Sequence, residues 1–136
     1  YYFADIGLRN ARLNFRQVEE THIMENIIYN DLIRRGYNVD VGVVEYNQTK
    51  DNKKKRIQLE VDFVVNRGNI RYYIQSALTL ESNEKREQEI NSLKRIDDSF
   101  KKIVIVKDDI IPRYDEQGIY YIGVKDFLLT DNIFEN

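Results

Sequence analysis

The sequence predicts a single α/β domain in which a mixed β-sheet carries helices on both faces. Residues 21–35 have the spacing of an amphipathic helix, and residues 37–80 contain three β-rich runs separated by short polar breaks. A charged helix over 81–100 is followed by a nearly continuous apolar run at 101–109, which is typical of a strand covered on both faces. The expected core order is therefore helix, three strands, helix, strand.

The composition restricts the chemistry that the domain can perform. Cysteine is absent from the 136 residues, which excludes thiolate zinc sites and thiol catalysis, so any metal would be bound by oxygen. With 21 basic and 23 acidic residues, the overall field gives no attraction for phosphate. No window approaches the roughly 18 uninterrupted apolar residues of a membrane span. We therefore expect a cytoplasmic domain without a membrane partner.

The first 20 residues are predicted to be a connector from a preceding module, and residues 21–136 to be the domain itself. The opening "YYFADIGLRNARLNF" has the pattern of a strand end followed by a short helix, with Asp5 placed to cap the first turn. Because the sequence starts at Tyr1 and not at a methionine, we expect a fragment of a longer chain.

The helix predicted over 21–35 should end at Gly36, which can adopt the left-handed conformation that stops a helix. Its helical period sets Glu25 beside the apolar stripe instead of on the solvent face. That stripe consists of Ile23, Met24, Ile27, Ile28 and Leu32.

The first strand is expected over 37–46, and the basic segment "KDNKKKR" at 50–56 is predicted to be a loop before the second strand. This loop either contacts phosphates or is simply solvated. In the second strand, 57–66, alternation puts Glu60 and Asp62 on one face with Val64. The opposite face then carries Val61, Phe63 and Val65.

A tight turn at 67–69, "RGN", leads into the third strand over 70–80, which pairs antiparallel with the second. Alternation separates Tyr73, Gln75 and Ala77 on one side from Tyr72, Ile74 and Ser76 on the other. Tyr72 and Tyr73 are the candidates for base stacking if nucleic acid binds.

The helix over 81–100 has Ser82 or Asn83 as its candidate cap, and its inward residues are predicted to be Ile90, Leu93 and Ile96. After the strand at 101–109, residues 118–129 are expected to form a further strand that runs into a short helix.

This order of elements, with an acid in the first helix and the strand motifs "EVDF" and "YIQ", resembles the restriction-endonuclease-like superfamily, the PD-(D/E)XK nucleases, over roughly residues 20–108. The resemblance implies that Glu25, Asp62 and Gln75 occupy the acidic positions that hold magnesium or manganese in active members. Ala77 falls where the catalytic lysine belongs, and it can neither carry charge nor activate water.

The stretches "HIMENIIYNDLIRRGYNVDVG", "EVDFVV" and "YYIQSALTL" resemble, more closely, the uncharacterised C-terminal domain of prokaryotic predicted AAA+ superfamily ATPases. That resemblance implies an N-terminal ATPase module as the partner in the same protein, and ATP binding only in that module. The phosphate-binding pattern "GxxxxGK[ST]" does not occur in this sequence.

Three functional hypotheses follow. The leading one is a non-catalytic or degenerate nuclease-like domain that binds nucleic acid or a protein through the face bearing Glu25, Asp62 and Gln75. The second is an active magnesium-dependent nuclease that adds Glu60 as a ligand. Its missing lysine would be replaced by a displaced basic residue, for which the candidates are Lys85, Arg86 and His22. The third is an interaction scaffold whose acidic cluster is purely structural, with Glu25 paired to Arg34, Arg35 or a backbone amide.

Overall fold

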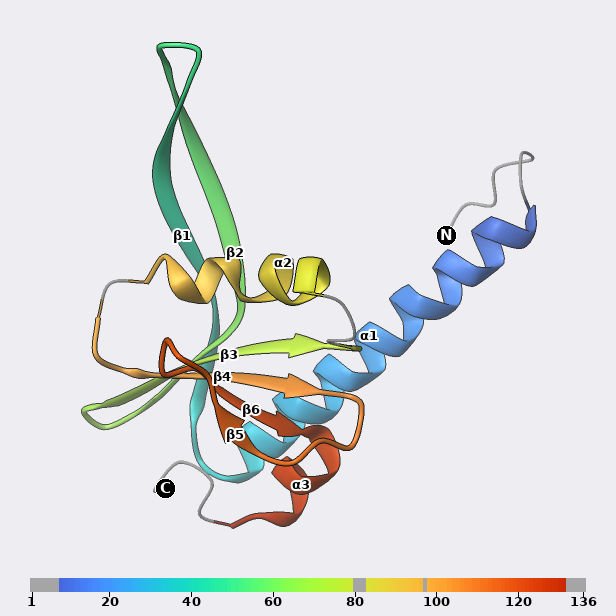
Figure 1. Cartoon of the computed structure of the whole chain (residues 1–136). Helices are drawn as coiled ribbons and strands as arrows, with labels where there is room; N and C mark the ends of the chain where they lie inside the picture. The colour runs from blue at the N-terminus through green and yellow to red at the C-terminus, as the bar shows by residue number, and fades with distance from the viewer. Residues whose placement is uncertain (1–7, 80–82, 97, 132–136) are drawn as a thin grey trace.

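A computed structural model describes residues 8–79, 83–96 and 98–131 of the chain. In this part the chain forms a sheet with helices packed against it (Figure 1). The elements are α1 (Leu8–Arg34), β1 (Asn38–Lys50), β2 (Lys53–Arg67), β3 (Ile70–Ala77), α2 (Asn83–Lys94), β4 (Lys101–Val106), β5 (Arg113–Tyr114), β6 (Tyr120–Gly123) and α3 (Val124–Leu129).

The sheet has six strands in the order β1-β2-β3-β4-β6-β5. Strands β1, β2 and β3 are antiparallel neighbours, β3, β4 and β6 run parallel, and β5 pairs antiparallel with β6. The predicted mixed sheet and the order helix, three strands, helix, strand are confirmed, as are the later strand and helix. The short edge strand β5 was not predicted, because two residues carry no periodic signal.

Helices cover both faces of the sheet, as predicted. One apolar cluster joins α1 and α3 to the sheet and includes Ile28, Ile103 and Phe127. The other joins α2 to the opposite face and includes Ile90 and Leu93. Along β4 the side chains alternate between the two clusters, so the strand is buried on both faces.

Helix α1 is longer than predicted, since it runs unbroken from Leu8 to Arg34 and not from residue 21. The segment contains neither glycine nor proline, so nothing in it breaks the helix. Its first half projects from the body of the domain (Figure 1). The predicted cap at Asp5 lies outside the described residues, and the division of the chain at residue 20 stays a prediction.

The buried stripe of α1 is narrower than predicted. Met24, Ile28 and Leu32, spaced by four residues, are buried, whereas Ile23 and Ile27 are 53% and 42% exposed. The sheet contacts only one narrow side of the helix, which is why the broader apolar pattern in the sequence overestimated the buried face.

The end of α1 is closed as predicted by Gly36, whose φ is +92°. The Gly36 N–H donates to the Ile33 carbonyl at 2.9 Å and the Tyr37 N–H to the Leu32 carbonyl at 3.1 Å, which together form a Schellman motif. This cap turns the chain directly into β1.

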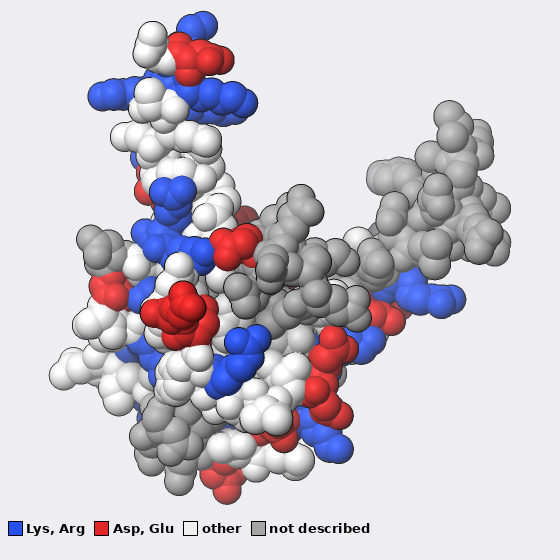
Figure 2. All heavy atoms as spheres, viewed as in Figure 1, with Lys and Arg blue, Asp and Glu red and all other residues white. Residues whose placement is uncertain are grey.

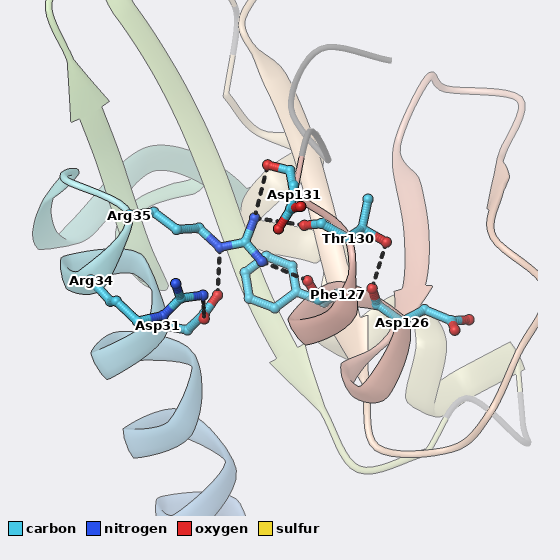
Figure 3. A network of polar contacts seen from close by, with 7 residues as sticks. All are labelled: Asp31, Arg34, Arg35, Asp126, Phe127, Thr130 and Asp131. Atoms are coloured by element: carbon cyan, nitrogen blue, oxygen red, sulfur yellow. Dashed lines mark hydrogen bonds and ion pairs between the residues drawn. The ribbon is translucent and has the colours of Figure 1, made fainter.

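Arg35 ties this end of α1 to the end of α3 (Figure 3). Its Nε donates to Asp31 Oδ2 at 2.6 Å, and its two terminal nitrogens donate to the carbonyls of Phe127 at 2.9 Å and Thr130 at 2.8 Å. The guanidinium carbon also lies 5.1 Å from the centroid of the Phe127 ring. Carbonyls at a helix C-terminus lack partners within the helix, so the arginine satisfies them and holds the two helices together.

The basic segment 50–56 is not a loop, and the prediction was wrong on this point. Strands β1 and β2 stay paired until Lys50 faces Lys53, and only Asp51 and Asn52 form the turn, with φ of 54° and 62°. Asp and Asn tolerate positive φ, and two such residues make the turn that matches the twist of a hairpin. The polar composition of this segment indicated a loop, whereas the structure has a long projecting hairpin. The glycine turn at 67–69, by contrast, is confirmed.

A β-bulge interrupts the alternation of β2. Asp40 faces Val64 and Gly42 faces Val61, so Asp62 and Phe63 together lie opposite the single residue Val41. Phe63 and Val65 therefore pack in the α1 cluster, while Val61 and Val64 belong to the α2 cluster. The predicted common face of Val61, Phe63 and Val65 is wrong for Val61, because simple alternation does not allow for the extra residue.

The bulge requires glycine at position 42. A Cβ there would lie 2.5 Å from Val64 Cγ2 and 3.4 Å from Val61 Cβ. Because β-branched valine has little rotamer freedom, we expect Gly42→Ala to lower the free energy of unfolding by about 1–3 kcal/mol in urea titrations. The control is Val41→Ala at the neighbouring position, whose side chain is 67% exposed. Equal stability of the two variants would contradict the close approach.

The adjacent residues Arg34 and Arg35 provide a matched test of the link between α1 and α3. Both pair with Asp31, but the Arg34 side chain is 67% exposed and that of Arg35 is 10% exposed. We expect Arg35→Met to cost about 3 kcal/mol in urea unfolding, because it leaves buried polar groups without a partner. Arg34→Met should cost less than about 1 kcal/mol. A similar loss in both variants would show that Arg35 does not hold the helices together.

Candidate functional site

The candidate site is centred on Asp62 at the bulge of β2. Its carboxylate oxygen Oδ2 accepts hydrogen bonds from the Ser76 N–H and from the Ser76 hydroxyl, both at 2.9 Å. Regular pairing of β2 with β3 ends at Phe63 and Ile74, one position before these contacts. The side chain of Asp62 therefore continues the connection between the strands where backbone pairing stops.

Gln75 contacts Asp62 through the backbone. Its side-chain oxygen Oε1 accepts a hydrogen bond from the Asp62 N–H at 3.1 Å. This contact uses the same side-chain oxygen that would bind a metal ion. Asp62 is consequently held at two points, its N–H by Gln75 and its carboxylate by Ser76.

Partial burial raises the pKa of Asp62 above the ordinary aspartate value of 3.8, and the negative charge of Glu60 acts in the same direction. The two hydrogen bonds from Ser76 oppose this shift, because they stabilise the ionised form. Burial is the largest of these influences. The carboxylate is therefore held in an environment that favours its neutral form more than water does.

The structure brings the predicted acids Glu25, Glu60 and Asp62 to one cavity of about 280 Å³. Glu25 is half-buried on α1, Asp62 is half-buried and Glu60 is exposed on β2. The remaining lining side chains are Asn26, Tyr29, Val41 and Phe63. Three carboxylates thus share one small cavity between α1 and the β1–β2 pair.

These acids do not form a compact ligand shell. Within the described residues, no group of three or more His, Asp or Glu side chains is placed so that it could hold a metal ion. The Gln75 oxygen also accepts a hydrogen bond from the Asp62 N–H, so a metal ion there would have to share this oxygen with the backbone. The assignment of metal-binding roles to Glu25, Asp62 and Gln75 stays a prediction.

Ala77 lies in the apolar interior beneath α2, where it is 4% exposed and pairs with Val106 of β4. A lysine at this position would place its ammonium group among aliphatic side chains. Two positions of β3 therefore have different environments. Gln75 belongs to the polar network around Asp62, and Ala77 belongs to the apolar core.

Of the basic residues considered as replacements for the lysine, His22 is exposed on α1. Lys85 and Arg86 lie in the first turn of α2, but their side chains lie outside the described part of the chain. Arg34 and Arg35, suggested as partners of Glu25, both pair with Asp31.

Tyr72 and Tyr73, the candidates for base stacking if nucleic acid binds, are buried. Each is 8% exposed. Tyr72 packs edge-on against Tyr37 with the ring centroids 6.2 Å apart, and the Tyr73 hydroxyl donates to Asp98 Oδ2 at 2.6 Å. Their rings face the two apolar layers, as is ordinary for tyrosine in a covered strand.

Three residues of the site were not predicted from the sequence: Ser76, Asn26 and Tyr29. Ser76 was placed on the correct face of β3, but only the bulge in β2 turns the Asp62 carboxylate toward it. Tyr29 follows Glu25 by one helical turn, so the period of the helix could have indicated it.

These features define a mixed α/β domain in which a strand aspartate is fixed by hydrogen bonds beside an acidic cavity. The chain belongs to the family described as "Domain of unknown function (DUF4143)", whose model matches residues 20–127. It is also 33% identical over 133 residues to an uncharacterized protein of Haemophilus influenzae. The match covers 95% of this chain but only 28% of the relative's length.

None of the described helices combines the length and the apolar character needed to cross a bilayer.

The raised pKa of Asp62 predicts how Asp62→Asn changes stability. Between the ordinary carboxyl pKa and the raised one, the folded protein binds more protons than the unfolded chain, so this group lowers stability as pH rises. Asparagine keeps an oxygen for Ser76 and does not ionise. We expect the stability of Asp62→Asn relative to the wild type to increase as the pH rises above about 4, as measured by urea unfolding.

Glu60→Gln is the matched control, because it removes the same charge from an exposed neighbour on β2. Because the Glu60 charge contributes less than burial to the raised pKa of Asp62, the stability of Glu60→Gln relative to the wild type should rise less than that of Asp62→Asn over the same pH range. An Asp62→Asn variant whose relative stability does not vary with pH would show that the Asp62 carboxylate is not disfavoured by the fold.

Proposed function

We propose that this domain is a non-catalytic or catalytically weakened member of the restriction-endonuclease-like superfamily. The observation that supports this most directly is the state of the third strand, where Gln75 is hydrogen-bonded to Asp62 and Ala77 is buried in the core. A nuclease of this type needs free carboxylate and carbonyl oxygens for metal and a cation near the attacking water. Here the Gln75 oxygen accepts a hydrogen bond from the Asp62 N–H, and Ala77 supplies no cation.

On this proposal the domain is the C-terminal binding or regulatory part of a cytoplasmic AAA+ ATPase. The resemblance of its sequence to the C-terminal domains of such proteins supports this, as does the greater length of the Haemophilus influenzae relative. ATP would bind only in the preceding module. Hydrolysis there would drive or gate the contact that this domain makes with nucleic acid or with a protein.

The partner would approach the face that carries the cavity of Glu25, Glu60 and Asp62. The cavity is small and carries three carboxylates, so it suits a few directed contacts and not a broad apolar interface. The Asp62–Ser76 hydrogen bonds fix the position of one wall, which reduces the entropy lost when a partner binds.

The alternative is an active magnesium-dependent nuclease. The observation that favours it is the convergence of Glu25, Glu60 and Asp62 on one cavity, since magnesium is bound by oxygen ligands. A cation from elsewhere would then have to replace the lysine that Ala77 cannot supply.

Measurements of cleavage and of metal binding distinguish the non-catalytic domain from the active nuclease. We expect the chain, incubated with manganese, to leave single-stranded, duplex and branched DNA and RNA intact. We also expect manganese to leave its melting temperature unchanged, because a ligand stabilises a protein only if it binds the folded state.

The control is Asp62→Ala, with Glu60→Ala as a second variant of an exposed carboxylate on the same strand. Cleavage by the wild type that disappears in Asp62→Ala would overturn the proposal in favour of the nuclease. A manganese-dependent rise in melting temperature that is lost in the same variant would establish a metal site.

A further inference from the structure

The β1–β2 hairpin extends beyond the body of the domain as a projecting arm, defined here as residues 47–56 (Figure 1). Its strands pair without interruption from Asn47 opposite Arg56 to Lys50 opposite Lys53. All its side chains are exposed. With a rise of about 3.4 Å per residue, the arm reaches roughly 15 Å from its base. At the base, the Arg95 guanidinium lies 4.0 Å from the centroid of the Tyr46 ring.

The arm concentrates positive charge in an acidic protein. It contains five basic side chains and one acidic one, a net charge of +4, whereas the whole chain has a net charge of −2. Lysine and arginine side chains gather at the end of the projecting hairpin (Figure 2). The global charge of the protein therefore conceals a strongly basic protrusion.

Much of this charge is not neutralised within the domain. Arg56 pairs with Glu45, but the ion pairs found among the described residues do not involve the four lysines of the arm. Lys50 and Lys53 lie directly opposite each other across the ladder, and like charges in that position are destabilising. A bound polyanion would remove this repulsion.

The composition of the arm favours phosphate over a protein surface. The segment "NQTKDNKKKR" has no aliphatic or aromatic residue, whereas protein interfaces have an apolar core with enriched aromatic side chains. Lysine, arginine, asparagine, glutamine and threonine are the side chains that contact phosphate and sugar in nucleic-acid complexes. Every one of these types occurs in the arm.

The placement of charge favours a groove over a flat anionic surface. Alternation along β2 puts Lys53 and Lys55 on one face of the ribbon and Lys54 and Arg56 on the other. A membrane would be contacted by one face at a time. The major groove of B-form DNA admits a two-stranded ribbon and presents phosphates on both sides of it.

We propose that residues 47–56 form an arm that enters a groove of duplex nucleic acid and binds the phosphates on its two sides. This surface lies apart from the Asp62 cavity and requires neither catalysis nor the proposed use of that cavity. Because the contacts are made with the backbone, the binding is independent of base sequence and sensitive to salt.

The test is fluorescence anisotropy of the 136-residue chain with labelled duplex DNA, duplex RNA and phosphatidylserine vesicles as separate probes. For the wild type, we expect duplex binding with a salt slope near −3, since each neutralised phosphate contributes about −0.9. The Lys53→Gln/Lys55→Gln variant should bind at least about tenfold more weakly at about 50 mM salt, with a slope smaller in magnitude by about 2.

The control variant, Lys107→Gln/Lys125→Gln, removes the same charge from exposed positions on the body of the domain. It should bind within about twofold of the wild type. Melting temperatures confirm that both variants fold. A higher affinity for duplex DNA or for duplex RNA would show which of the two nucleic acids the arm binds. Absence of duplex binding by the wild type, equal loss in both variants, or binding to vesicles alone would each overturn the proposal.

Discussion

The β-bulge in β2 is the constraint on which the arrangement of the site depends. One extra residue opposite Val41 shifts the alternation, so Phe63 and Val65 pack under α1 while Val61 packs under α2. The same shift directs the Asp62 carboxylate to Ser76. Gly42 makes the bulge sterically feasible, because any side chain there would meet Val64. Apolar packing, a backbone distortion and a polar contact thus have a common geometric origin.

Strand β2 also connects the two surfaces to which functions are proposed. At the bulge it carries Asp62 beside the cavity, and beyond the body it continues into the basic arm at residues 47–56. The two surfaces differ in their physical character. The cavity is partly buried and acidic, and its aspartate is fixed by hydrogen bonds. The arm is fully exposed and basic, and it is held by its own ladder and turn and by the pair of Arg56 with Glu45. A partner held by the arm would experience a different electrostatic environment from one at the cavity.

The three helices are attached to the sheet by different kinds of contact. Helix α2 is attached through apolar contacts with Ile90 and Leu93, whereas α1 and α3 share both an apolar cluster and the polar link through Arg35. Apolar burial is non-directional, so it determines that a helix covers the sheet. The bonds of Arg35 to the carbonyls of Phe127 and Thr130 are directional, and they determine how the two helix ends meet.

The sequence alone determined the elements whose signals are local. The period of α1, the glycine stop at position 36, the turn at Gly68 and the apolar run of β4 were all readable, because each depends on neighbouring residues. The identity of the acids near Asp62 also followed from residue order. Tertiary structure alone decided the bulge, the choice of Ser76 as the partner of Asp62, the narrow buried side of α1 and the extent of the hairpin. Each of these depends on contacts between segments distant in sequence, where steric fit and pairing register override the local pattern.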